Sequence, residues 1–132
     1  MEGRGYEVLD VSKNPDYFYK DVDFIITSPT TGKTKTFEVK WDTRIHTTGN
    51  LYLERTSIFT KEEGIKGLGW FEWCEADYLA YGDAISGQFY MIPMAELRVA
   101  ADNLPYRSAR CGYDSTGQLV NLSDISDITI LL

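Results

Sequence analysis

Three charged residues in the first third of the chain have the types and spacing of a metal-assisted hydrolytic site. Asp23 lies fifteen residues before Glu38, and Lys40 follows Glu38 at a spacing of two. Two carboxylates side by side bind a hard cation such as Mg²⁺, which prefers oxygen ligands and keeps several waters. Such a cation polarises a phosphodiester and lowers the pKa of a bound water, while a nearby ammonium orients that water or stabilises phosphate charge. Asp23 and Glu38 are therefore candidate metal ligands, and all three residues are candidates for catalysis.

The elements that must position these residues are two β-rich runs on either side of Ser-Pro-Thr-Thr-Gly at 28–32, a segment with the composition of a turn. If residues 29–32 form the loop, Phe24 pairs with Phe37 and Asp23 with Glu38. Directly opposed residues share a face, and Lys40 joins that face because it lies two residues further on. We therefore expect the charged face to be turned away from the core. The other face is expected to supply core residues, namely Val22, Phe24, Ile26, Phe37 and Val39.

A strand that begins with Asp, a turn, and a strand that carries Glu-x-Lys resembles the active site of the PD-(D/E)xK nuclease superfamily. The resemblance covers about residues 5–100, and segments 49–54 and 69–81 look like small phage or prophage members. It implies an α/β fold with a restriction-endonuclease-like core, a central mixed β-sheet flanked by one or two helices. The family core usually opens with a helix before the first strand. Because only four residues precede Gly5 here, we expect that helix to be missing, truncated or supplied elsewhere.

The resemblance also implies an activity and a cofactor. The activity is hydrolysis of DNA phosphodiester bonds, with Mg²⁺ as cofactor and Mn²⁺ as its substitute. In the family the backbone carbonyl between Glu and Lys is a further metal ligand, which here is the carbonyl of Val39. The family also implies the cytoplasm of a bacterial or phage-infected cell. The absence of a signal peptide and of a long apolar run agrees with that location and predicts no membrane span.

Two other interpretations of the motif remain open. Glu-x-Lys alone is a common tripeptide, and a cross-strand charge cluster on an exposed sheet face has the same pattern. The alternative function is a non-catalytic interaction protein, an inhibitor or DNA mimic that keeps the nuclease scaffold. Such a protein would use its acidic C-terminal half, since residues 67–132 carry three basic and nine acidic groups, a net charge of −6.

The charge distribution indicates where a nucleic acid would bind. The whole chain has a net charge of −7, which argues against a general nucleic-acid binder. Residues 33–66, however, carry seven basic and five acidic groups, a net charge of +2. Because the chain is short and acidic, we expect it to act as a homodimer or with a protein partner. The candidate DNA-binding residues are Lys33, Lys35, Arg44, His46, Asn50, Arg55, Lys61 and Lys66.

Other residues have two interpretations each. Asp21 is an alternative metal ligand or a charge partner of Lys40, and Glu54 is an additional acid or a surface residue. His46 contacts phosphate or lies in a solvated loop. Trp70 and Trp73 stack on the bases of single-stranded DNA or belong to the core.

Length and local patterns give the remaining organisation. At 132 residues the chain is expected to form a single domain, 1–132. Pro93 suits the first position of a helix over 94–101. The other expected elements are a strand at 5–12, a polar loop at 43–50, a strand or helical turn at 51–55, a hairpin of 77–81 with 88–92, a turn at 114–117 and a short strand at 119–122.

Overall fold

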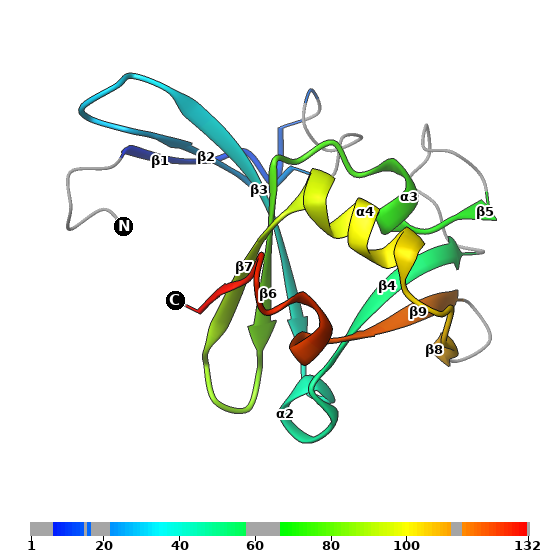
Figure 1. The fold of residues 1–132 in the computed structure, drawn as a ribbon. Helices are drawn as coiled ribbons and strands as arrows, with labels where there is room; N and C mark the ends of the chain where they lie inside the picture. Colours follow the sequence, from blue (N-terminus) through cyan, green and yellow to red (C-terminus); the bar gives the residue numbers. More distant parts are fainter. Residues whose placement is uncertain (1–6, 15, 17–21, 58–66, 112–114, 132) are drawn as a thin grey trace.

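Two β-sheets with short helices beside them make up the fold (Figure 1). The computed structural model describes residues 7–14, 16, 22–57, 67–111 and 115–131. Within these residues, the larger sheet has the strand order β1 (Glu7–Asp10), β2 (Phe24–Thr27), β3 (Thr34–Asp42), β6 (Tyr78–Asp83), β7 (Phe89–Pro93) and β10 (Ile130–Leu131). The smaller sheet has the order β5 (Gly67–Leu68), β4 (Asn50–Ser57), β9 (Ser115–Asn121) and β8 (Ser108–Cys111). The helices are α2 (Ile45–Thr48), α3 (Trp70–Trp73), α4 (Met94–Asn103) and the 3₁₀ helix η2 (Leu122–Ile125).

The larger sheet is mixed, as predicted for an α/β fold. β3 and β6 are parallel, and the other neighbouring pairs in this sheet are antiparallel. Parallel neighbours need a long crossover, and here the crossover from β3 to β6 contains α2, β4, β5 and α3. The predicted second hairpin is also confirmed, because β6 and β7 pair directly. Few helices accompany the sheets, but the described residues contain four short ones, where one or two were expected.

The β2–β3 hairpin has the register that its turn predicts. Phe24 pairs with Phe37, and the backbone N–H of Ser28 donates to the carbonyl of Lys33 at 2.9 Å. Gly32 has a φ of +69°, a conformation that residues with a side chain rarely adopt, and it closes the loop. The turn chemistry therefore determines which residues of β2 and β3 lie opposite one another.

The charged face of β3 is turned toward the interior, so the predicted orientation of the hairpin is wrong. Glu38 pairs with Leu79 of β6, which pairs with Ile92 of β7, and both of these partners are fully buried in the core. Glu38 itself is only 3% exposed. In Figure 1, α3, α4 and the smaller sheet all lie on one side of the larger sheet. Of the residues expected in the core, Val22 and Phe37 are buried, and Phe24, Ile26 and Val39 are half-buried.

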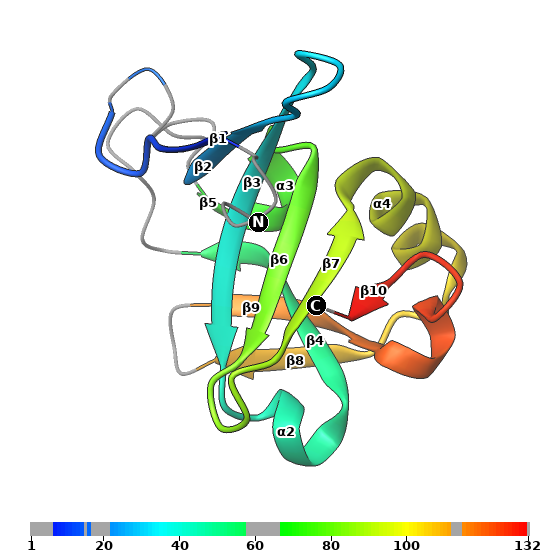
Figure 2. The same ribbon diagram turned by 90° about the vertical axis from the view of Figure 1, so that its left-hand side faces the viewer.

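The smaller sheet lies behind the larger one in Figure 2, with its strands running across those of the larger sheet. The segment 51–55 is part of strand β4, which settles that alternative. The predicted turn at 114–117 is wrong over 115–117, because these residues begin β9 and pair with β4 and β8. The expected polar loop at 43–50 contains the single helical turn α2.

Helix α4 confirms the helix predicted over 94–101 and extends it to Asn103. Pro93 is the last residue of β7 and the N-cap of α4. It was predicted at the first position of the helix and lies one residue before it. Met94, Leu97 and Ala101 are the buried residues of this helix, at the spacing of one helical face. In the described part of the chain no helix has the length and apolar character needed to cross a membrane.

Candidate functional site

Strand β3 presents Glu38, Lys40 and Asp42 on the same face, because side chains alternate along a strand. Their partners on β6 are Leu79, Tyr81 and Asp83, which share that face. The face runs from the core at Glu38 to a half-exposed edge at Lys40 and Asp42. Along this face of β3, a buried carboxylate is therefore followed by a partly accessible ammonium and then by a second carboxylate.

Glu38 and Lys40 form an ion pair. The Nζ atom of Lys40 lies 3.2 Å from Oε1 of Glu38, and the side chains are 28% and 4% exposed, respectively. The same Nζ atom lies 4.9 Å from the ring centroid of Trp70, within the range of a cation–π interaction. The ammonium is thus held between the carboxylate of Glu38 and the aromatic ring of α3.

Asp23 reaches the same part of β3 from the start of β2. The regular ladder ends at the Phe24–Phe37 pair, and the N–H of Asp23 also donates to the carbonyl of Phe37, at 2.8 Å. The Asp23 carboxylate accepts a hydrogen bond of 2.9 Å from the N–H of Val39. The ladder therefore does not include the predicted direct pairing of Asp23 with Glu38. The side chain of Asp23 instead binds the backbone of the residue between Glu38 and Lys40.

The metal ligands predicted from the sequence are all hard oxygen atoms. They are the carboxylates of Asp23 and Glu38 and the carbonyl of Val39, the type of ligand that Mg²⁺ prefers. No group of three or more His, Cys, Asp or Glu residues arranged to hold a metal occurs among the residues that the structure describes. A cation here would keep several waters, which is the usual behaviour of Mg²⁺. The alternative ligand Asp21 lies outside the described residues.

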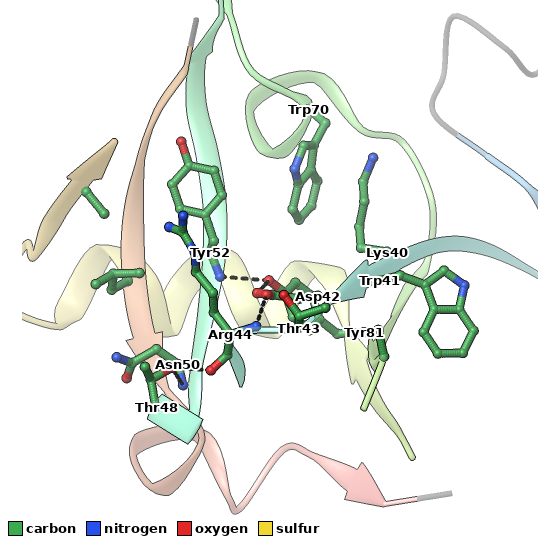
Figure 3. Close-up of a pocket in the computed structure, with 13 residues that line it drawn as sticks. Lys40, Trp41, Asp42, Thr43, Arg44, Thr48, Asn50, Tyr52, Trp70 and Tyr81 are labelled. Atoms are coloured by element: carbon green, nitrogen blue, oxygen red, sulfur yellow. Dashed lines mark hydrogen bonds between the residues drawn. The ribbon is translucent and has the colours of Figure 1, made fainter. Parts of the chain in front are cut away.

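A pocket of about 620 Å³ opens beside Lys40, between the end of β3 and the smaller sheet. Figure 3 shows Lys40 and Trp70 on one side of it and Arg44 and Tyr52 on the other, with Asp42 between them. The complete lining is Lys40, Trp41, Asp42, Thr43, Arg44, Thr48, Asn50, Tyr52, Trp70, Tyr81, Ala84, Ala109 and Leu119.

A hydrogen-bond network at the pocket joins the two sheets. The Tyr81 hydroxyl donates to the Asp42 carboxylate at 2.5 Å and accepts from the N–H of Tyr52 at 3.0 Å. The other carboxylate oxygen of Asp42 accepts from the N–H of Arg44 at 2.7 Å. Burial, and then the hydrogen bond to Asp42, raise the pKa of Tyr81 far above its ordinary value. Tyr81 is therefore a neutral donor that fixes Asp42 in place.

His46 binds Asp83 at the turn after β6. Its Nδ1 atom lies 2.9 Å from the Asp83 carboxylate, which also accepts from the N–H groups of Ile85 and Ser86 at 2.8 and 3.0 Å. Burial raises the pKa of Asp83, but the hydrogen bonds from Ser86, His46 and Ile85 outweigh this effect and lower the pKa to about 2. The geometry thus favours a structural role for His46 over the predicted contact with phosphate.

The other predicted DNA-binding residues lie in different environments. Lys33 and Lys35 are exposed on the hairpin, whereas Arg44 and Asn50 line the pocket. The guanidinium of Arg55 donates to Glu72 at 2.5 Å and to Gln118 at 2.6 Å, and packs over Phe71. That arrangement favours an interior structural role for Arg55. The remaining two, Lys61 and Lys66, lie outside the described residues.

The sequence left two interpretations for three further residues, Glu54, Trp70 and Trp73. Trp73 is half-buried at the end of α3. The Glu54 carboxylate accepts from the N–H of Trp70 at 3.2 Å, so it binds the first residue of α3. Trp70 is half-buried and packs against the core, which agrees with its core interpretation. It also lines the pocket, and its stacking on bases stays a prediction.

Sequence reasoning missed the network of Asp42, Tyr81 and Tyr52. Asp42 follows Lys40 at a spacing of two, so strand alternation alone would have placed it on the charged face. The contributions of Tyr81 and Tyr52 depend on the pairing of β3 with β6 and on the position of the smaller sheet, for which the local sequence carries no signal.

Comparison with protein family models, with characterised proteins and with solved structures finds no significant match to this chain. A function must therefore be argued from the site itself.

Proposed function

We propose that the chain is a metal-dependent deoxyribonuclease that hydrolyses phosphodiester bonds beside Lys40, on a restriction-endonuclease-like core. The observation that supports this most is the position of the Lys40 ammonium. It lies 3.2 Å from the buried carboxylate of Glu38 and also forms part of the wall of a pocket. A cation site at the backbone of Val39 would therefore be next to the space in which a substrate phosphate can lie.

Each residue has a distinct part in this proposal. A bound divalent cation supplies polarisation of the phosphodiester and a bound water of lowered pKa. Asp23 and Glu38 hold that cation with their carboxylates, and Val39 offers its carbonyl. Lys40 donates hydrogen bonds to the water or to the phosphate oxygens, on which negative charge develops during the reaction. Arg44, on the other side of the pocket, attracts the substrate phosphate.

The second candidate function is a binding protein that keeps this scaffold without catalysis. It is favoured by the intramolecular contacts of both carboxylates, since Asp23 accepts from Val39 and Glu38 pairs with Lys40. In that case the charged residues stabilise the hairpin in the interior, and the acidic C-terminal half provides the binding surface.

A cleavage assay distinguishes the two functions. Labelled single-stranded and duplex DNA are incubated with the protein in Mg²⁺, in Mn²⁺ and in EDTA. We expect cleavage only with metal, and a loss of cleavage in Glu38→Gln, which removes a ligand charge with little change of shape. Glu96→Gln, at an exposed position of α4, is the matched control and should cleave normally. Absence of cleavage under every condition would support the binding protein.

A further inference from the structure

The pocket beside Lys40 combines two chemical surfaces. Its aromatic surface includes Trp70 and Tyr52, which come from α3 and β4. Its polar surface includes the two cations Lys40 and Arg44, the amide of Asn50 and the carboxylate of Asp42. That carboxylate already accepts from the Tyr81 hydroxyl and the Arg44 N–H. The volume of about 620 Å³ lies within the range of about 300–1,000 Å³ that is usual for small-ligand pockets. A ligand that fits this combination has a flat ring and a negative charge.

The two cations differ in how they are held. Lys40 is fixed by Glu38 and by the ring of Trp70. Arg44 is exposed, and its guanidinium has no carboxylate partner among the residues for which the structure gives side chains. Arg55 is the contrasting case, because Glu72 and Gln118 both accept from it. Of the two cations, Arg44 is therefore the more available to bind an anion.

We infer that this pocket binds one unpaired nucleotide of a single strand, with the base against the aromatic surface and the phosphate between Arg44 and Lys40. The inference rests on the proposed function, because it names the substrate class of that site. Stacking of a base on an aromatic side chain is tolerant of sequence and changes affinity by about 5- to 150-fold per base. A base inside a duplex is stacked and paired, and it must be extruded before it can enter a pocket. The site should therefore prefer single-stranded substrate.

Binding is measured in EDTA, where no cleavage occurs, by titrating the indole N–H signals of the tryptophans in nuclear magnetic resonance spectra. The probes are thymidine 5′-monophosphate, a thymidine octanucleotide and a duplex of the same length. Trp70→Phe assigns the indole signal of Trp70. We expect thymidine 5′-monophosphate to shift that signal, and the octanucleotide to bind at least about tenfold more tightly than the duplex.

Arg44→Gln should weaken binding of the monophosphate by about tenfold, because a charge-assisted hydrogen bond to phosphate is lost. Arg110→Gln is the matched control, since Arg110 is exposed and alternation along β8 turns it away from its pocket-lining neighbour Ala109. The inference is overturned if the monophosphate does not shift the Trp70 signal at millimolar concentration. Equal binding of the single strand and the duplex, or equal effects of the two arginine variants, would also overturn it.

This experiment fails independently of the proposed function. If the protein cleaves DNA with Mn²⁺ but no nucleotide binds in the pocket, the inference about the pocket is wrong and the proposed nuclease function stands. If the octanucleotide binds through Trp70 and Arg44 but is not cleaved under any metal condition, the proposed nuclease function is wrong. The pocket is then a binding site for single-stranded DNA. Preference of the free monophosphate over the octanucleotide would identify the ligand as a free nucleotide and overturn the inference.

Discussion

The carboxylate of Asp23 accepts a hydrogen bond of 2.9 Å from the backbone N–H of Val39, at the point where the regular β2–β3 ladder has ended. Asp23 therefore has a structural role in addition to the proposed metal site. Hydrogen bonds to charged groups contribute about 1.5–3 kcal/mol, so Asp23→Ala should lower the free energy of unfolding by about that amount. Asp23→Asn keeps an acceptor oxygen and should cost less.

Urea denaturation followed by circular dichroism measures these changes. Asp127→Ala, at an exposed position after η2, is the control and should change the free energy of unfolding by less than about 0.5 kcal/mol. If Asp23→Ala is as stable as the control, the contact between Asp23 and Val39 has no structural importance.

The second prediction concerns the metal. Titration calorimetry in the absence of DNA should show Mn²⁺ binding to the wild type and weaker binding to both Glu38→Gln and Asp23→Asn, because each variant loses one anionic ligand. Glu96→Gln should bind Mn²⁺ as the wild type does. Equal Mn²⁺ binding by wild type and Glu38→Gln would show that Glu38 is not a ligand and would contradict the proposed metal site.

The hairpin register was predictable because its determinants are local. The composition of the turn and the positive φ of Gly32 set the pairing of Phe24 with Phe37. The orientation of that hairpin was not predictable in the same way. Charged residues on one face suggested an exposed face, but Glu38 is only 3% exposed, and α4 and the smaller sheet, formed by distant parts of the chain, lie on one side of the larger sheet. Whether a charge is buried depends on tertiary contacts, and here the ion pair with Lys40 compensates the cost of burying the Glu38 carboxylate.

The smaller sheet shows the same limit of prediction from local sequence. Ser115 to Gly117 have the composition of a turn, yet they pair with β4 and β8 as the start of β9. Gly117 lacks a side chain at a place where a Cβ atom would lie 2.6 Å from the carbonyl oxygen of Leu53. Glycine is thus required by close packing against a strand more than sixty residues away, a requirement that the local sequence does not reveal.

The third prediction concerns acid stability. The pKa of Asp83 is lowered from its ordinary 3.8 to about 2, so its contribution to stability is complete above about pH 4 and is lost as the pH falls through 2. The difference in free energy of unfolding between the wild type and Asp83→Asn should therefore shrink as the pH falls from about 4 to 2. Urea denaturation at several pH values measures this difference. A difference that is constant over this interval would contradict the role of the ionised carboxylate.

The fourth prediction concerns the network between the sheets. Tyr81→Phe removes the donor to Asp42 and the acceptor for the N–H of Tyr52, both at a position that is 3% exposed. The loss should be about 1–3 kcal/mol in the free energy of unfolding, because buried polar groups lose their partner. Tyr106→Phe, at a position that is 58% exposed, is the control and should have little effect. Equal stability of the two variants would show that the network contributes nothing to the joining of the sheets.

The activity of Lys40→Met tests the proposed nuclease most directly, because Lys40 is neither a metal ligand nor a residue of the fully buried core. Methionine keeps most of the length of the side chain and removes its charge. Lys13→Met, at an exposed position after β1, is the matched control. Cleavage of labelled single-stranded DNA is measured in Mn²⁺ on samples whose folding and Mn²⁺ binding have been verified. We predict that Lys40→Met binds Mn²⁺ and cleaves at least about 10²-fold more slowly than the wild type, while Lys13→Met cleaves normally. Cleavage by folded Lys40→Met at the wild-type rate would contradict the account.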